Sequence, residues 1–390
     1  VYDDGATTSS DGTGKPRGMK KATREQIKQH NQQLVLKSLY HHAADNRAAL
    51  AQETGLTKPT ISSIVTELME AGLVIEGDRG TSSTNGGKRP RLLHFVPTAR
   101  QIIAVTVTRE QVLGCLAYLD GTVVARHHIA VPDGNAVLPP LHGVIDALHA
   151  QTDAPLLCLS VGVPGVVDNA AGVVVSSPSL GWKNAPLAEQ LSGRYELPTF
   201  IGNNTEFATR AQALTRDETR SLVTLLISDT VEIGSTIDGA TYQHGADITV
   251  LHTPGGPVAM LEWANVKARA TVLAAAQANS VLPNPPPTYL HIRRALLQHD
   301  PAAHLLLDEI SETLAAVYAW VYGLMRPTEI ALAGQMSLLG PQLLDAVRDK
   351  LYTLVPGGTV QGVRLMLAPD DDLTLQGAVA NALHKELAIL

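Results

Sequence analysis

The spacing of apolar side chains changes near residue 100. In the first part of the chain, apolar residues recur at helical spacing and predict three short helices, over residues 25–40, 47–54 and 58–71. Beyond residue 100, strand-length runs of Val, Ile and Leu alternate with longer helical segments. The pattern therefore predicts a small helical domain followed by an α/β body.

A tight turn separates the second and third predicted helices. Gly55 stands where a glycine ends a helix, Thr57 is suited to cap the next one, and Pro59 lies in its first turn, where proline is tolerated. The apolar face of the first predicted helix is expected to carry Ile27, Leu34, Val35, Leu36 and Leu39. Three short helices with such a turn are the sequence form of a helix-turn-helix.

Small or cationic side chains lie on the face of the third helix opposite its apolar stripe, as a major-groove contact requires. Strands predicted over 73–76 and 88–95 then flank a loop rich in Gly, Ser, Thr and Asn, which makes a wing with four cations. The candidate DNA-binding residues are Thr57, Lys58, Thr60, Ser62 and Ser63 on the helix, and Arg79, Lys88, Arg89 and Arg91 on the wing. The alternatives are an ordinary solvated helix face and a plain linker.

The body is expected to contain a mixed sheet. Its first three predicted strands cover 102–108, 112–119 and 123–131, and Asp120-Gly121 predicts the hairpin turn between the last two. The other predicted strands cover 156–163, 222–227 and 329–333. The predicted helices cover 138–150, 265–278, 291–297, 305–325 and 341–354.

The charge of the chain is divided unevenly between these parts. The 390 residues carry a formal net charge of −7, yet residues 19–100 hold 12 Lys and Arg against 7 Asp and Glu, whereas 101–390 hold 16 against 27. A basic segment on an acidic body is typical of a DNA-reading module. Residues 1–18, rich in Gly, Ser, Thr and Asp, are expected to be a disordered tail or a cloning remnant. The expected domains are therefore 19–100 and 101–390.

The remaining composition indicates the compartment. The two cysteines, Cys115 and Cys158, lie in apolar, strand-like runs and are expected to be buried thiols, not a disulfide or a metal pair. No apolar run is long enough to span a membrane, and no secretory signal is recognisable. We expect a soluble, cytoplasmic, nucleoid-associated protein without a membrane partner.

Several phrases resemble the ROK family, which comprises repressors and sugar kinases with a two-lobed actin/hexokinase-like fold. They occur in the family's order, as LA…GLTKPTIS over 50–62, GGKRP over 86–90, VGVPGVVD over 161–168, and SPSLGW over 177–182 followed by PL at 186–187. The resemblance runs from Lys20 onwards. It implies a winged helix-turn-helix joined to two lobes, one of about 101–201 plus the C-terminal helix and one of about 202–374.

The departures from the family's kinases concern their catalytic groups. The glycine-rich phosphate loop is replaced by the segment Val105 to Glu110, which has no glycine. The Asn-Asp pair that contains the general base is Asn203-Asn204, and an amide is not a useful base near neutral pH. A second glycine-rich turn aligns with Ser228 to Gly234, which carries two acids that would repel phosphate. The sequence therefore predicts a protein that is not an enzyme.

The family's zinc cluster is also missing. The matching segments, 246–250 and 253–262, contain no cysteine, and His244 and His252 alone do not make a tetrahedral site. We expect no metal and no cofactor.

Polar side chains at the positions of the family's sugar site are partly retained. The candidate ligand-binding residues are Ser179, Asn203, Asn204, Asp247 and Glu262, whose amides and carboxylates suit hydroxyl recognition. The resemblance implies a homodimeric repressor of carbohydrate-related genes that binds a palindromic operator in double-stranded DNA and responds to a sugar-like effector. The alternatives are a DNA-binding scaffold without an effector and an active sugar kinase.

Overall fold

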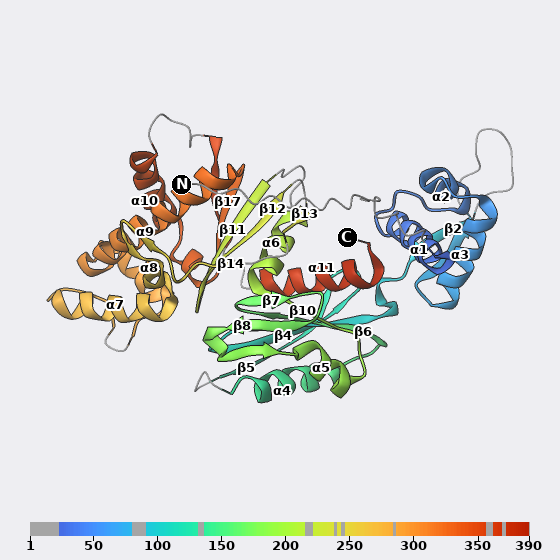
Figure 1. Cartoon of the computed structure of the whole chain (residues 1–390), viewed down its shortest axis with the longest axis horizontal. Coiled ribbons are helices and arrows are strands. Elements are labelled where there is room, and N and C mark those ends of the chain that lie inside the picture. The colour runs from blue at the N-terminus through green and yellow to red at the C-terminus, as the bar shows by residue number, and fades with distance from the viewer. Residues whose placement is uncertain are drawn as a thin grey trace, which may run out of the picture. The chain divides into compact units, whose positions relative to one another are not determined.

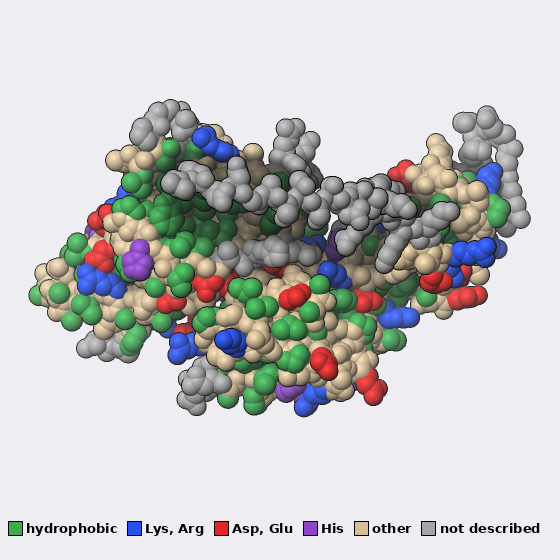
Figure 2. All heavy atoms as spheres, in the orientation of Figure 1, with side chains coloured by type: hydrophobic (Ala, Val, Ile, Leu, Met, Phe, Trp, Pro, Cys, Tyr) green, Lys and Arg blue, Asp and Glu red, His purple; other side chains and the backbone are tan. Residues whose placement is uncertain are grey.

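The computed structural model describes residues 23–79, 91–131, 136–214, 221–237, 240–242, 246–283, 286–355, 362–368 and 372–389. The chain divides between Phe95 and Val96 into two compact units, where the sequence placed the boundary near residue 100. Figure 1 labels the elements of both units. Charged side chains of both signs are interspersed over the described surface in Figure 2. The segment 1–18, expected to be disordered, lies outside the described residues.

The N-terminal unit is a winged helix. Its elements are α1 (Arg24–Tyr40), α2 (Arg47–Thr54), α3 (Lys58–Glu70), β1 (Val74–Arg79) and β2 (Arg91–Phe95), with β1 antiparallel to β2. The core of this unit consists of apolar side chains from all three helices and both strands, including Val35, Leu39, Leu50, Ile61, Val65, Val74 and Leu93.

Two local features determine the turn between α2 and α3, a glycine at the end of α2 and a threonine cap at the start of α3. Gly55 has φ +70° at the end of α2, a conformation that costs glycine little. The Thr57 hydroxyl accepts the Thr60 amide at the start of α3. Both features agree with the sequence.

Two expectations for this unit were wrong. Ile27 is 49 % exposed because only the C-terminal half of α1 is buried, with Val35, Leu36 and Leu39 as its apolar members. Strand β1 also extends to Arg79, which pairs with Arg91, so the strand covers residues that the sequence placed in the wing loop.

The second unit contains two sheets, one in each lobe. The first sheet has the order β10-β6-β3-β4-β5. Its strands are β3 (Gln101–Val107), β4 (Gln111–Tyr118), β5 (Val123–Ala130), β6 (Leu156–Val163) and β10 (Thr199–Asn203). Helices α4 (Leu138–His149) and α5 (Leu187–Tyr195) lie on one face and α11 (Leu373–Leu387) on the other (Figure 1). Because both faces are covered, every residue of β3 is buried.

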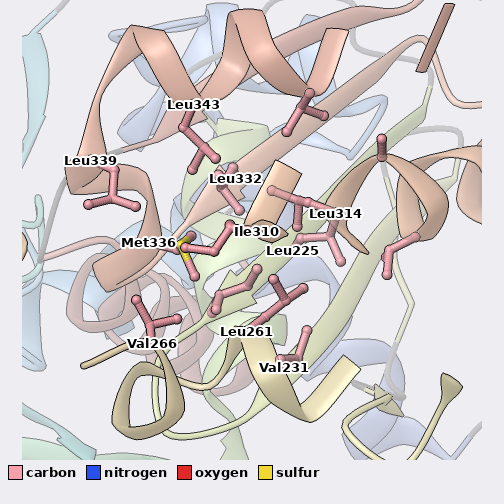
Figure 3. Close-up of a cluster of buried hydrophobic side chains, with 14 of the residues drawn as sticks. Leu225, Val231, Leu261, Val266, Ile310, Leu314, Leu332, Met336, Leu339 and Leu343 are labelled. Carbon is pink, nitrogen blue, oxygen red and sulfur yellow. The ribbon is translucent and has the colours of Figure 1, made fainter. Parts of the chain in front are cut away.

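The second sheet has the order β13-β12-β11-β17-β18, with β14 on β12. Its strands are β11 (Ser221–Ile227), β12 (Val231–Ile237), β13 (Ala240–Thr241), β14 (Ala246–Asp247), β17 (Glu329–Ala333) and β18 (Arg364–Ala368). The helices of this lobe are α7 (Trp263–Ala276), α8 (Tyr289–Leu297), α9 (Pro301–Met325) and α10 (Pro341–Leu354). Leu225, Leu332, Ile310 and Leu343 converge in its core (Figure 3).

Caps explain where two of these helices start earlier than expected. The Asp300 carboxylate accepts the Ala303 amide, and Pro301 follows at the first helical position, so α9 begins four residues before the predicted start. Thr288 and His291 form a capping box that starts α8 at Tyr289.

Helix α6 (Asn204–Leu214) packs against both α11 and β12. A Cβ atom at Gly377 of α11 would lie 1.8 Å from the Phe207 carbonyl oxygen, so the two helices are in backbone contact. The sequence had not predicted α6, although its residues 204–209 and 211–212 are buried. Because these buried residues are both polar and apolar, the segment shows no apolar stripe at helical spacing from which the helix could be predicted.

Smaller elements complete the second unit. A three-stranded sheet consists of β7 (Val166–Asp168), β8 (Val173–Ser177) and β9 (Trp182–Ala185), and a hairpin consists of β15 (His252–Thr253) and β16 (Gly256–Pro257). Single-turn helices are η1 (Pro97–Ala99), η2 (Pro178–Leu180), η3 (Val258–Leu261) and η4 (Gln335–Leu339). Cys115 and Cys158 are buried, unpaired thiols, as expected. No helix in the described ranges has the length and apolar character needed to cross a membrane.

Candidate functional site

Two adjoining cavities lie between the lobes of the second unit. Cavity A, of about 380 Å³, is lined from the first sheet and α6 by Thr106, Thr108 and Asn204, and from the second lobe by Ser228, Thr230, Glu232 and Gln335. Cavity B, of about 590 Å³, is lined by Arg109, Glu110, Ser179, Asp229, Asp247, Thr249 and Glu262, among others. Glu110, Asp229 and Thr230 line both cavities.

The turn between β3 and β4 is held by hydrogen bonds between its own residues and by one to the second lobe. The Thr108 hydroxyl donates to the Gln111 carbonyl, at 3.1 Å, and accepts the Gln111 amide. The Arg109 amide donates to Asp229 Oδ2, at 2.6 Å. A phosphate cradle needs free backbone amides at such a turn. Here the Asp229 carboxylate already accepts the Arg109 amide.

The lining of cavity B includes four acids, Glu110, Asp229, Asp247 and Glu262. Burial, and then the negative charges of Asp247 and Asp229, raise the pKa of Glu262 above its ordinary value. Burial also raises the pKa of Asp229, although the Arg109 amide opposes that shift. Arg109 is the only Lys or Arg among the residues that line cavity B. The cavity therefore has an anionic lining.

Three of the five candidate ligand-binding residues lie together. Ser179, Asp247 and Glu262 line cavity B. One oxygen of each acid is already occupied, because Asp247 Oδ1 accepts the Thr249 amide and Glu262 Oε2 accepts from Asn265. The Ser179 hydroxyl is buried and has no hydrogen-bond partner within the described part of the chain.

The two adjacent asparagines are separated by the structure. Asn204 lines cavity A, where its amide group bonds the Val107 carbonyl and the Thr106 hydroxyl. Asn203 is 1 % exposed and is not among the residues lining cavity A or B. Its side chain caps α6 by accepting the amides of Thr205 and Glu206.

Glu232 belongs to the site in a way that the sequence did not reveal. The segment 228–234 was expected to be a turn with two acids facing phosphate, but the turn ends at Thr230 and Glu232 lies on β12, 1 % exposed. Its carboxylate accepts hydrogen bonds from Gly165, Asn203 and Thr205. Burial raises its pKa from 4.5 to about 7. The sequence did contain one sign that Glu232 belongs to the site: it is an acid within an apolar, strand-like segment and has no basic neighbour in the sequence.

The segment that resembles the zinc cluster is closed by hydroxyl groups. In the β15–β16 hairpin, the Thr253 hydroxyl donates to the Gly256 carbonyl, at 2.9 Å, and accepts the Gly255 amide. The Thr313 hydroxyl of α9 donates to the Gly255 carbonyl. Within the described ranges, no group of three or more His, Cys, Asp or Glu side chains is arranged to hold a metal ion.

The candidate DNA-binding residues whose side chains the structure describes lie at the N-cap of α3, on α3 and on β2. Thr57, Lys58, Ser62 and Ser63 are exposed, and Thr60 is half-buried with its hydroxyl 2.8 Å from that of Thr57. Arg91 is paired with Glu76, which also binds Arg47, and these two hydrogen bonds lower the pKa of Glu76. Lys88, Arg89 and the Arg79 side chain lie outside the described residues.

Residues 102–249 match the ROK family. The xylose repressor of Bacillus spizizenii is 32 % identical over 184 residues, which make up 45 % of this chain and 47 % of that protein. The chain spans about half the length of the curated relatives that it matches first.

Two solved structures have a similar fold. One is a ROK family transcriptional regulator, a homolog of the Escherichia coli MLC protein, with a TM-score of 0.74 and 21 % identity over 93 % of this chain and 98 % of its own. The other is a ROK family glucokinase from Streptomyces griseus in complex with glucose and AMPPNP, with a TM-score of 0.65 and 17 % identity over 72 % of this chain and 98 % of its own. The sequence match over residues 102–249 and the fold of these two structures thus point to the same family, ROK, to which this part of the chain is similar.

Proposed function

We propose that this protein is a sequence-specific, DNA-binding transcriptional regulator, a repressor whose ROK body binds a sugar-like effector and does not transfer phosphate. The observation that carries the proposal is the exposed polar face of α3, which follows a Gly55 turn in a winged helix. A helix so presented fits the major groove, with its first residues against base edges. The similarity to the Bacillus spizizenii xylose repressor supports the same function.

In the proposed mechanism, two copies present paired α3 helices to the half-sites of a palindromic operator. Lys58 is the one cation of α3 and lies at its exposed N-terminal end. The wing cations contact adjacent phosphates or the minor groove. An effector between the lobes favours one lobe arrangement and so alters the fit of the two DNA heads.

The chemistry of the two cavities favours an uncharged effector. Phosphoryl transfer needs a cradle for the nucleotide phosphates and a group that accepts or orients the attacking proton. In this chain Asp229 occupies the Arg109 amide, and the position of the base is held by an amide, Asn204, bonded to Thr106 and Val107. Anionic phosphate is repelled by the carboxylates of cavity B, whereas sugar hydroxyls can donate to them.

The test is selection of binding sites from random duplex DNA at physiological salt, with and without a pool of free sugars. We expect a palindromic site to be enriched and to lose occupancy when sugar is added. Failure to enrich any site would contradict the proposal that the protein is a sequence-specific regulator. Enrichment without a sugar response would favour the alternative, a DNA-binding scaffold without an effector. That scaffold is distinguished by thermal melting with each sugar, because a ligand of the folded state raises the melting temperature.

The role of Lys58 has its own expected outcome. Lys58→Ala should weaken operator binding, with the slope of log affinity against log salt reduced by about 1 if Lys58 meets a phosphate. If it meets a guanine, discrimination at one base pair should fall by about 1–3 kcal/mol instead. Lys37→Ala, at an exposed position of α1, is the matched control and should leave both quantities unchanged. Equal effects of both substitutions would show general electrostatics only.

A further inference from the structure

A buried carboxylate connects the two lobes at the floor of cavity A. Glu232, on β12 of the second sheet, accepts the Gly165 amide on Oε1 at 2.7 Å, and the Asn203 amide group and Thr205 hydroxyl on Oε2 at 3.1 and 2.7 Å. Gly165 follows β6, Asn203 ends β10, and Thr205 lies in the first turn of α6. One side chain of the second sheet thus joins three segments at the edge of the first.

The backbone around these donors is closely packed. Gly165 has φ +97°, and a Cβ atom there would lie 2.3 Å from the Ser176 carbonyl oxygen. On the other side, a Cβ atom at Gly234 would lie 2.4 Å from the Thr209 hydroxyl, so β12 lies directly against α6. The Asn203 amide group also donates to the Gly165 carbonyl, at 2.7 Å. The three donors are therefore held in place by one another and by the backbone.

Within the described part of the chain, the hydrogen-bond partners of this carboxylate are the uncharged groups of Gly165, Asn203 and Thr205. Burial raises the pKa of Glu232 to about 7, the three hydrogen bonds lower it, and the charge of Asp247, its register partner on β14, raises it further. The titratable and charged groups on the surrounding elements are Asp247 on β14, Glu206 and Arg210 on α6, Asp229 before β12, and Asp168 on β7.

We propose that Glu232 is a proton-sensitive positioning residue: it sets how the second lobe is held against the β6–β7 turn and the start of α6. When ionised, the carboxylate only accepts hydrogen bonds and satisfies all three donors. When protonated, it carries an O–H that needs an acceptor of its own, whereas Gly165, Asn203 and Thr205 all donate to it, so the hydrogen-bond arrangement must change. Because these hydrogen bonds connect the two lobes, proton uptake by Glu232 alters how the lobes are held together beside cavity A. The proposal stands whether or not the cavities bind a sugar.

The first test compares the melting temperatures of the full-length chain and Glu232→Gln between about pH 5 and about pH 8. A carboxyl whose pKa is raised by folding favours the folded state below its unfolded pKa, and this contribution is lost as pH rises through the folded pKa. The melting temperature of the parent protein minus that of the variant should therefore fall across this range. Glu189→Gln, at an exposed position of α5 away from both cavities, is the control and should show no such trend. A pH-independent difference for Glu232→Gln overturns the proton-sensitive role.

The second test uses Thr205→Val, which keeps the shape of the side chain and removes one donor. Because the Thr205 hydroxyl stabilises the ionised form, the loss in melting temperature should grow as pH rises. Hydrogen exchange should become several-fold faster in peptides covering 163–168 and 203–214, and remain unchanged in α9. This variant also serves if Glu232→Gln does not fold. Unchanged exchange in both peptides, or a loss independent of pH, overturns the proposal.

Discussion

Asn203 and Asn204 use adjacent amides for different purposes. Asn203 caps α6 and donates to Glu232 and Gly165, whereas Asn204 binds the end of β3 and lines cavity A. The difference arises because the chain passes from strand to helix at this point, which turns consecutive side chains in different directions. A ligand between the lobes can therefore contact Asn204, while Asn203 supports the fold that surrounds it.

At the same scale, Gly165 should tolerate no side chain. Gly165→Ala adds a Cβ atom 2.3 Å from the Ser176 carbonyl oxygen at φ +97°, and should lower the free energy of unfolding by about 3 kcal/mol. Gly121→Ala is the matched control, because its φ of +85° is similar but nothing lies within 4 Å of the added atom. That variant should cost about 1 kcal/mol. Chemical denaturation measures both, and equal losses would show that the Ser176 contact is unimportant.

Among the elements, α2 depends on its N-terminal cap and on a single fully buried side chain. Leu50 is the only fully buried residue of α2, whose start is capped by the Asn46 side chain through the amides of Ala48 and Ala49. A short helix with so small a core gains much of its stability from such a cap. The position of α3 depends in turn on the α2 turn before it.

Asn46→Ala should therefore loosen the winged helix. Loss of the cap costs about 1 kcal/mol, which is roughly a five-fold increase in local opening. Hydrogen exchange in peptides from α2 should accelerate by about that factor, with exchange in α9 unchanged. Gln52→Ala, at an exposed position of the same helix, is the control. Equal acceleration in both variants would show that the effect does not arise from the loss of the cap.

At the scale of the whole molecule, a fold similar to that of a sugar kinase surrounds two cavities whose linings include several acids. The two sheets, α6 and α11 resemble the fold of a glucokinase, yet acids line the hollow between the lobes. Fold similarity alone therefore does not indicate the activity, which depends on particular side chains.

Magnesium-ATP at millimolar concentration should leave the melting temperature of the protein unchanged. Asp229 occupies the Arg109 amide, and Glu110 is paired with Lys267 at 3.0 Å, so neither the amide nor that lysine is available to a phosphate. A ligand that binds the folded state must raise the melting temperature. A clear rise with magnesium-ATP, together with ATP-dependent phosphorylation of any sugar in the pool, would favour the kinase.

Much of the local structure could be predicted because it depends on neighbouring residues. Gly55, Thr57 and Pro59 define the turn between α2 and α3, and uninterrupted apolar runs mark buried strands such as β6 and β17. Helix α6 and strand β12 could not be predicted, because their buried polar residues are paired with residues far along the chain. Ser179, Asp247 and Glu262 were identified through the family resemblance, and their meeting in cavity B required the fold.

The sequence by itself determined a winged helix with a polar α3 face followed by an α/β body, and the loss of the phosphate-binding and zinc motifs. These features follow from periodicity, turn chemistry and residue type, which act over a few residues. Only the tertiary structure decided that Asp229 takes the Arg109 amide, and that Glu232 joins segments at the edge of the first sheet. Asp229 and Arg109 are 120 positions apart along the chain, and Glu232 and Gly165 are 67 apart. The burial that strengthens these hydrogen bonds exists only once both lobes have packed.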